Sequence, residues 1–229
     1  MLLLAIVAPV LGTNCYLVAQ DGGHECLIVD PGIGLDDRLA TVLDEHSLHP
    51  TAVLVTHGHL DHTFGLLALC QRYELPVYLH KDDVYRLDDP ITTLGPALAP
   101  MFGDFGGQWT PPTDVRPLSD GDQLDLAGVN VTAVHAPGHT EGSTLYYIPT
   151  VDDPAESLCF TGDVLFVGTI GRTDLPGGDD ALMTRTLSAL ARPESEGGLP
   201  DAAKVLPGHG EASTFGRERA TNPYLRGNQ

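Results

Sequence analysis

The sequence predicts an α+β protein that folds as a four-layer αββα sandwich, with two sheets face to face and helices on both outer sides. Strand-like apolar runs form two successive groups, one in each half of the chain, and each group is interleaved with helix-like periodicity. The 229 residues, 42% of them hydrophobic and 19% charged, are enough for a sizeable core without disulfides or a structural metal. We therefore predict a single domain over residues 1–229.

The first half opens with the apolar residues 1–10. We interpret them as a first buried strand rather than a secretion signal, because no basic segment precedes them and Pro9 interrupts the run. The short apolar runs 16–19 and 26–29 are separated by the turn sequence D-G-G. This arrangement predicts a hairpin of two strands.

Helical spacing of apolar residues then predicts three helices. The first has its apolar face over residues 35–43 and is expected to stop at Pro50, and the others have theirs over residues 66–73 and 183–190. Further strands are predicted at residues 52–55, 77–79, 123–126, 129–134, 144–148, 158–160 and 204–206.

Residues 88–117 show no regular period and are rich in Gly and Pro. They nevertheless carry Met101, Phe102, Phe105 and Trp109, which makes the segment too apolar for a solvated linker. We interpret it as a candidate lid or interface loop, whose role the sequence does not decide.

The charge of the chain limits its partners. With 31 Asp and Glu against 12 Lys and Arg, the net charge of −19 would repel nucleic acid and acidic lipid surfaces. The four cysteines are far apart and read as reduced thiols, and no apolar run approaches the length of a membrane span. We expect a cytoplasmic protein that binds a small molecule, and the sequence leaves homodimer formation open.

The most informative segment is T-H-G-H-L-D-H at residues 56–62, which follows the strand predicted at 52–55. Alternate residues His57 and His59 can turn toward one ion, whereas Asp61 and His62, at the next helix start, can face a second ion. Imidazole and carboxylate ligands without cysteine suit zinc, iron or manganese. The segment therefore predicts a metal site.

Three further candidate ligands each follow a predicted strand and stand next to glycine. They are His139 in A-P-G-H-T, Asp163 in T-G-D and His209 in P-G-H-G. Glycine lets the backbone approach a site closely, so these residues complete the predicted set.

Other polar residues serve as a contrast. We expect His24, His46 and His49 at the surface, and adjacent acidic residues such as Asp82-Asp83 in solvated loops or helix starts. His80 and His135 either orient a metal ligand or are ordinary hydrogen-bonded histidines.

The order T-H-G-H-L-D-H, P-G-H-T, T-G-D, P-G-H-G resembles the metallo-β-lactamase superfamily, across almost the whole chain. The resemblance implies that His57, His59 and His139 bind a first metal and that Asp163 bridges it to a second, together with a hydroxide. The second metal would be bound by Asp61, His62 and His209. We expect two divalent ions, zinc first, with iron or manganese as alternatives.

Within the superfamily, the sequence is most similar to glyoxalase II, the hydroxyacylglutathione hydrolases, through D-P-G at residues 30–32, the run G-R-T-D-L-P-G-G-D at 171–179 and the tail from Glu218. True β-lactamases lack the bridging carboxylate at Asp163, so antibiotic hydrolysis is not the expected main function. Only 20 residues follow His209, so the helical C-terminal domain of full-length glyoxalase II is absent from the prediction.

The predicted activity is metal-dependent hydrolysis of a thioester such as S-lactoylglutathione by the bridging hydroxide, which Asp61 would orient or deprotonate. Arg172 would hold a substrate carboxylate, and its alternative is an ion pair with Asp174. The competing hypothesis is a persulfide dioxygenase with one iron on His57, His139 and Asp163.

Overall fold

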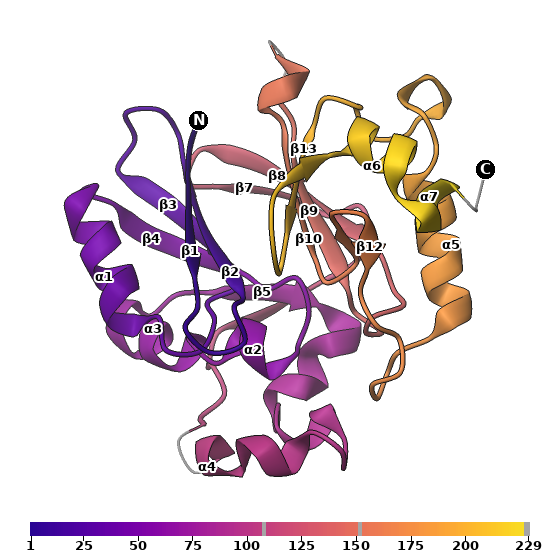
Figure 1. The fold of residues 1–229 in the computed structure, drawn as a ribbon. Helices are drawn as coiled ribbons and strands as arrows, with labels where there is room; N and C mark the ends of the chain where they lie inside the picture. The colour runs from indigo at the N-terminus through magenta and orange to yellow at the C-terminus, as the bar shows by residue number, and fades with distance from the viewer. Residues whose placement is uncertain (107–108, 151–152, 227–229) are drawn as a thin grey trace.

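The structure is a computed structural model that describes residues 1–106, 109–150 and 153–226. Two six-stranded sheets lie between outer layers of helices, as Figure 1 shows, so the predicted four-layer αββα sandwich is confirmed. In the described residues, no helix is long and apolar enough to cross a membrane.

The first sheet has the order β1-β2-β3-β4-β5-β6, and its first three strands are antiparallel whereas β3 to β6 run parallel. The hairpin of β2 and β3 is therefore confirmed. The six strands of this first sheet are β1 (Leu2–Val7), β2 (Asn14–Ala19), β3 (Glu25–Val29), β4 (His49–Leu54), β5 (Val77–His80) and β6 (Val115–Leu118). The first two parallel pairs are joined through α1 (Asp36–Glu45) and through α2 (Leu60–Thr63) with α3 (Leu66–Tyr73), and the segment with the short helices described below joins β5 to β6.

The second sheet has the order β14-β13-β10-β9-β8-β7 and is antiparallel except where β10 pairs with β13. Helix α5 (Asp180–Leu190) makes that crossover, and α6 (Phe215–Thr221) and α7 (Pro223–Arg226) follow. The strands are β7 (Gln123–Leu126), β8 (Val129–His135), β9 (Thr144–Ile148), β10 (Leu158–Gly162), β13 (Lys204–Pro207) and β14 (Ser213–Thr214), with a small separate hairpin of β11 (Leu165–Phe166) and β12 (Thr169–Ile170).

Three apolar clusters hold the four layers together. One lies between the sheets and includes Tyr16, Leu54 and Phe160. A second packs α1 and α3 against the first sheet, and a third packs α5 against the second sheet through side chains such as Met183 and Leu187. Successive residues of a strand thus point alternately into the cluster between the sheets and into the cluster under the helices, as expected for a sheet that is covered on both faces.

The first helix ends earlier than the sequence predicts. It stops at Glu45, because Ser47 takes a left-handed conformation (φ 52°) and Leu48 donates its N–H to the Leu43 carbonyl (2.8 Å). This pattern is a Schellman motif formed without glycine. Pro50 instead lies near the start of β4. The pairing of β4 with β5 begins only at Val53, so the missing N–H of Pro50 removes no hydrogen bond between these two strands.

The first strand also differs from the prediction. β1 is the edge strand of its sheet, and only Ile6 among its residues is fully buried. Because no strand covers the outer side of an edge strand, the apolar side chains of such a strand can stay partly exposed to solvent.

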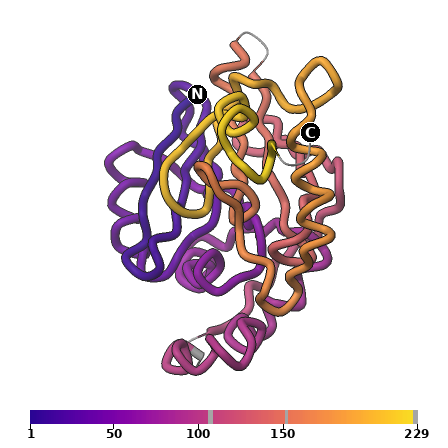
Figure 2. Tube along the Cα trace, turned by 45° about the vertical axis from the view of Figure 1, so that its right-hand side comes forward, coloured from indigo at the N-terminus to yellow at the C-terminus, as the bar shows by residue number. Residues whose placement is uncertain are grey.

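Residues 88–117 contain more structure than their sequence indicates. They include the short helices η2 (Thr92–Leu94), η3 (Ala99–Phe102) and α4 (Gly103–Gly106), which extend below the two sheets in Figure 2, and then β6. The sequence missed β6 because it is four residues long and contains Pro117, which an edge strand tolerates. Trp109 anchors the segment by donating its indole N–H to the Leu87 carbonyl (2.8 Å).

Candidate metal centre

The seven predicted ligands come from four segments that each follow a strand, and Asp61 and His62 lie on the short helix α2 within the first of them. His57, His59, Asp61 and His62 follow β4, and the other three loops supply one ligand each. Those ligands are His139 after β8, Asp163 after β10 and His209 after β13. The two sheets thus bring together residues up to 152 positions apart, since His57 and His209 join one cluster.

Three histidines form the first ligand group: His57, His59 and His139. The Nδ1 atom of His59 lies 3.0 Å from His57 Nε2 and 2.9 Å from His139 Nε2. All three residues are buried, with at most 3% of their surface exposed. Three ring nitrogens therefore converge on one point, as a tetrahedral metal would require.

Asp61, His62 and His209 form the second ligand group. The Oδ2 atom of Asp61 lies 3.2 Å from His209 Nε2 and 3.6 Å from His62 Nε2. Asp163 lies between the groups, with Oδ1 3.4 Å from His62 Nε2 and Oδ2 3.7 Å from His139 Nε2. One carboxylate is thus placed to contact ions in both groups.

Hydrogen bonds behind the first group decide which nitrogens are free to bind. Thr56 donates its hydroxyl proton to Asp30, so it can only accept from Nδ1 of His57 (3.1 Å). His139 must likewise donate its Nδ1 proton to the Arg172 carbonyl oxygen (2.7 Å). Both rings are left with a bare Nε2 lone pair facing the centre, which is the form that ligates metal.

The second group is oriented in the same manner. Nδ1 of His62 donates to Asp30 Oδ2 (2.9 Å), which leaves Nε2 for a cation. His62 Nε2 and Asp163 Oδ1 are both buried and have no hydrogen-bond partner among the described residues. Buried polar atoms without partners are costly, so this pair fits a bound cation.

The electrostatics of the two groups differ. Burial, followed by the neighbouring His62, lowers the pKa of His57 well below its usual value, so this ring stays neutral. Burial also opposes a charge on His62, but nearby carboxylates outweigh it and raise its pKa to about 10. Those carboxylates are Asp61, Asp163 and Asp30. The second group therefore attracts positive charge, whether from a proton or from a metal ion.

Asp30 is a residue of the site that the motif analysis did not assign. It is 2% exposed and its backbone takes a left-handed conformation (φ 51°). Its carboxylate binds His62 and also accepts from the Thr56 N–H (2.8 Å) and hydroxyl (2.7 Å). The only sequence signal was the D-P-G turn, in which Asp tolerates this conformation.

Asp83 is fully buried, so the expectation of a solvated acidic pair is wrong for it. Its carboxylate accepts from the Gly58 N–H (2.7 Å), the Thr140 hydroxyl (2.8 Å) and the Gly142 N–H (2.9 Å). It therefore ties the loop of His57 and His59 to the loop of His139. Asp82, by contrast, is exposed as expected.

Arg86 completes this buried network. Its guanidinium is fully buried, lies 3.2 Å from Asp83 Oδ1, and also donates to Glu141 and to the Pro176 carbonyl (2.9 Å). A Cβ on Gly58 would lie 2.7 Å from the Arg86 side chain. Glycine between the two histidines is thus required by the close approach of Arg86.

The loop of His209 is held from the opposite side by β2 and the turn before it. Thr13 donates its hydroxyl to Asp61 (3.0 Å), and the Asn14 amide donates to the carbonyls of Pro207 (3.0 Å) and Gly210 (2.9 Å). These residues join the two sheets directly at the second ligand group. Nothing in their local sequence indicated this role.

The remaining histidines lie outside the cluster. His24, His46 and His49 are exposed, as predicted. His80 and His135 stack on each other with ring centroids 3.9 Å apart and planes within 7°. Among the described residues, neither ring forms a hydrogen bond with a predicted ligand.

Arg172 makes the ion pair that was the alternative to substrate binding. Its guanidinium contacts Asp174 through two hydrogen bonds of 2.6 and 2.7 Å. Its backbone carbonyl meanwhile accepts from His139. Binding of a substrate carboxylate by Arg172 stays a prediction.

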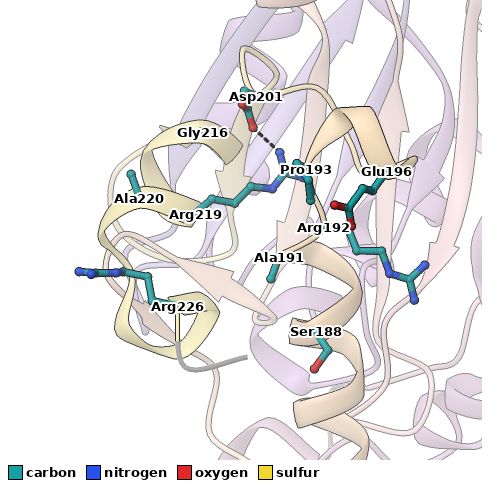
Figure 3. A pocket seen from close by; sticks show the side chains of 10 residues that line it. All are labelled: Ser188, Ala191, Arg192, Pro193, Glu196, Asp201, Gly216, Arg219, Ala220 and Arg226. Atoms are coloured by element: carbon teal, nitrogen blue, oxygen red, sulfur yellow. Dashed lines mark hydrogen bonds and ion pairs between the residues drawn. The ribbon is translucent and has the colours of Figure 1, made fainter. Parts of the chain in front are cut away.

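A cavity of about 500 Å³ opens onto the ligands, with His59, Asp61, His139, Asp163 and His209 in its lining. A larger cavity of about 810 Å³ lies between the end of α5 and helices α6 and α7 (Figure 3). Its arginines do not converge: Arg192 and Arg226 point away from each other, and Arg219 is bound to Asp201. Only the smaller cavity joins the ligand groups.

Comparisons with known proteins agree with this architecture. Residues 8–209 match the family described as the metallo-beta-lactamase superfamily. The uncharacterized protein Rv2581c of Mycobacterium tuberculosis is 40% identical over 228 residues, which is 99% of each chain. The hydroxyacylglutathione hydrolase GloC of Haemophilus influenzae is 32% identical over 218 residues, 93% of this chain and 92% of the relative.

Two solved structures are also similar to this chain over nearly its whole length. The BLEG-1 B3 metallo-beta-lactamase is 33% identical with a TM-score of 0.79, covering 98% of this chain and 99% of that one. TTHA1623 in a di-iron-bound form is 32% identical with a TM-score of 0.76, covering 96% and 99%. The whole length of the fold is therefore shared with proteins of this family.

Proposed function

Because the chain belongs to the metallo-beta-lactamase superfamily, we propose that it is a two-metal hydrolase that cleaves thioesters, as glyoxalase II-like enzymes do. The observation that carries this proposal is the complete second ligand group, with Asp163 placed between it and the first. The likeness to GloC over nearly the whole chain supports the choice of a thioester.

Two bound divalent ions, zinc first and iron or manganese as alternatives, would supply hydroxide at neutral pH and stabilise negative charge on the attacked carbonyl. Asp61 faces the cavity, and its Oδ2 atom is fixed by the Thr13 hydroxyl. We assign to Asp61 the orientation of the attacking water and the acceptance of its proton. A thiol has a pKa near 8.5, so the leaving group needs no dedicated general acid.

The donor set argues for two ions rather than for a single iron. A mononuclear dioxygenase would need only His57, His139 and Asp163, yet Asp61, His62 and His209 are also gathered within ligand distance of one another. The orphaned Nε2 atom of His62 belongs to this second group.

The test combines metal analysis with two assays on one sample of protein purified without added metal. About two ions per chain with cleavage of S-lactoylglutathione or another thioester would support the proposal. One iron per chain, with oxygen uptake on glutathione persulfide and no thioester cleavage, would overturn it in favour of the dioxygenase.

A matched pair of variants separates the specific role of Asp61 in cleavage from the general effect of removing one negative charge. Asp61→Asn should abolish cleavage, whereas Asp125→Asn, at an exposed position of β7, should leave it unchanged. Equal activity of both variants would remove Asp61 from the mechanism.

Hydrolysis of β-lactams is a second candidate, favoured by the 33% identity to a B3 metallo-beta-lactamase. The same metal-loaded sample is assayed on a chromogenic cephalosporin. Cleavage of the cephalosporin with a higher kcat/KM than any thioester would replace the first candidate by the second.

A further inference from the structure

The cavity beside the ligand groups is walled by apolar side chains from both halves of the chain. Its volume of about 500 Å³ is in the usual range of small-molecule sites, roughly 300 to 1,000 Å³. Leu94, Leu98, Met101 and Phe102 of the η2–η3 segment line it, together with Phe166 and Leu175 from the second half of the chain. We call these six residues the apolar wall.

The η2–η3 side of the wall is built on a small core of its own. Leu94 and Phe102 are buried in a cluster with Ile33, Leu60 and Ile91, separate from the three clusters that hold the layers together. This cluster holds η2 and η3 beside the ligand groups and presents their remaining apolar side chains to the cavity.

Apolar groups at the mouth of the cavity remain in contact with solvent. Met101 is 72% exposed and Leu11 is 55% exposed, and both line the cavity. They are two of the five large hydrophobic side chains found exposed in the part of the chain that the structure describes. Clustered exposed apolar surface next to a reactive centre is typical of a binding site for an apolar group.

Charge in the cavity lining comes almost entirely from the ligand groups. Apart from them, the described lining has one ionisable residue, Arg172, and the Nε–Nη2 edge of its guanidinium is already bound to Asp174. A glutathione thioester would bring two carboxylates and an ammonium group against this wall. The free edge of Arg172 could bind one of these carboxylates, but the desolvation of the other charged groups would be uncompensated against the apolar wall.

We propose that the substrate is a thioester with an uncharged hydrocarbon group that lies against the apolar wall, rather than a thioester of glutathione. This inference rests on the proposed thioester hydrolysis and names its substrate class. The hydrocarbon group belongs either to the acyl part or to the thiol part of the substrate, and two series of compounds distinguish these sources.

The first series carries acyl groups from acetyl to octanoyl on N-acetylcysteamine, a small uncharged thiol. The second carries a constant acetyl group on alkyl thiols from ethyl to octyl. We expect kcat/KM to rise about fourfold per added methylene in one series until the cavity is filled, the factor that corresponds to about 0.8 kcal/mol per buried methylene. The series that rises identifies the part of the substrate that the wall binds.

A flat response in both series, with S-lactoylglutathione cleaved best, would overturn this inference and leave thioester hydrolysis standing. Binding of uncleavable S-alkyl thioethers, measured by calorimetry, provides a second readout. Affinity that rises with chain length while no thioester is cleaved would support the apolar site and overturn the hydrolase. Neither binding nor cleavage would overturn both.

A matched pair of variants locates the effect. Met101→Gln keeps the length of the side chain but makes it polar, and should lower kcat/KM for octanoyl roughly four- to tenfold more than for acetyl. Val7→Thr makes another exposed apolar residue polar, outside the cavity, and should leave the chain-length dependence unchanged. An unchanged dependence in Met101→Gln, together with Leu98→Asn, would overturn the role of the wall.

Discussion

The two ligand groups differ in their access to solvent. Every member of the first group is at most 3% exposed, whereas His209 of the second group is 30% exposed and Asp61 is 14% exposed. In the first group, the rings also pack edge to face, with centroids 4.6 to 4.7 Å apart. Both groups contribute to the cavity lining, but the first is the more shielded from solvent, whereas the second is exposed through His209 and Asp61.

The residues behind the two groups differ as well. Asp83 and Arg86 hold the loops of the first group through a fully buried ion pair. The second group relies on Asp30 behind His62 and on the Thr13 hydroxyl at Asp61. Asp30 also accepts from Thr56, which orients His57, so the two sets of supports meet there. The Asp83–Arg86 pair and Thr13 nevertheless act on different groups, so substitutions should affect the two groups unequally.

The largest effect is expected at Asp163, which contacts both groups. Asp163→Ala should weaken binding at both metal positions and reduce thioester cleavage to background, because its carboxylate lies near both groups of the described ligands. Elemental analysis and a rate assay measure the two losses, with His46→Ala as a surface control. Retention of two tightly bound ions by Asp163→Ala would contradict a bridging position.

Asp83 should have the largest effect on stability. Asp83→Ala leaves the buried Arg86 guanidinium without its fully buried charge partner and should lower the free energy of unfolding by about 3–5 kcal/mol. The neighbouring Asp82→Ala provides the control, because that exposed carboxylate should change stability by only about 0.5 kcal/mol. Urea unfolding of both variants measures the difference. Equal losses in the free energy of unfolding would show that Glu141 alone compensates the charge of Arg86.

His209 separates the two groups from each other. His209→Ala should retain about one metal ion per chain, because the first group keeps its three ring nitrogens and Asp163. His57→Ala should instead weaken the first position, with the second still supplied by Asp61, His62 and His209. Metal titration by competition with a chelator checks both variants, and loss of both ions in His209→Ala would show that the positions are not separable.

Asp30 should produce the smallest of these effects. Asp30→Asn keeps the shape of the side chain but removes the charge that orients His62, and should weaken metal affinity roughly 10- to 100-fold. Asp44→Asn, at an exposed position of α1, is the control. Unchanged affinity in Asp30→Asn would mean that packing alone fixes the His62 ring.

Much of the architecture was predictable because it depends on local patterns. Alternating or continuous apolar runs predicted nearly every strand of both sheets, and helical spacing predicted the buried faces of α1, α3 and α5. Features with little local signal were missed. Ser47 ends α1 without glycine, and β6 is a short edge strand that contains proline.

The sequence by itself determined which residues gather at the centre, because each predicted ligand follows a strand and strand ends meet at the same edge of the sandwich. Only the tertiary structure decided how those residues are held. Asp82 and Asp83 look alike in sequence, yet Asp83 alone is buried, where it binds Thr140. Such contacts join residues 57 positions apart, and no local pattern encodes them. The sequence did single out Met101 and Phe102 as part of an apolar segment, but not their place beside Phe166 and Leu175, because these residues become neighbours only when the two halves of the chain pack together.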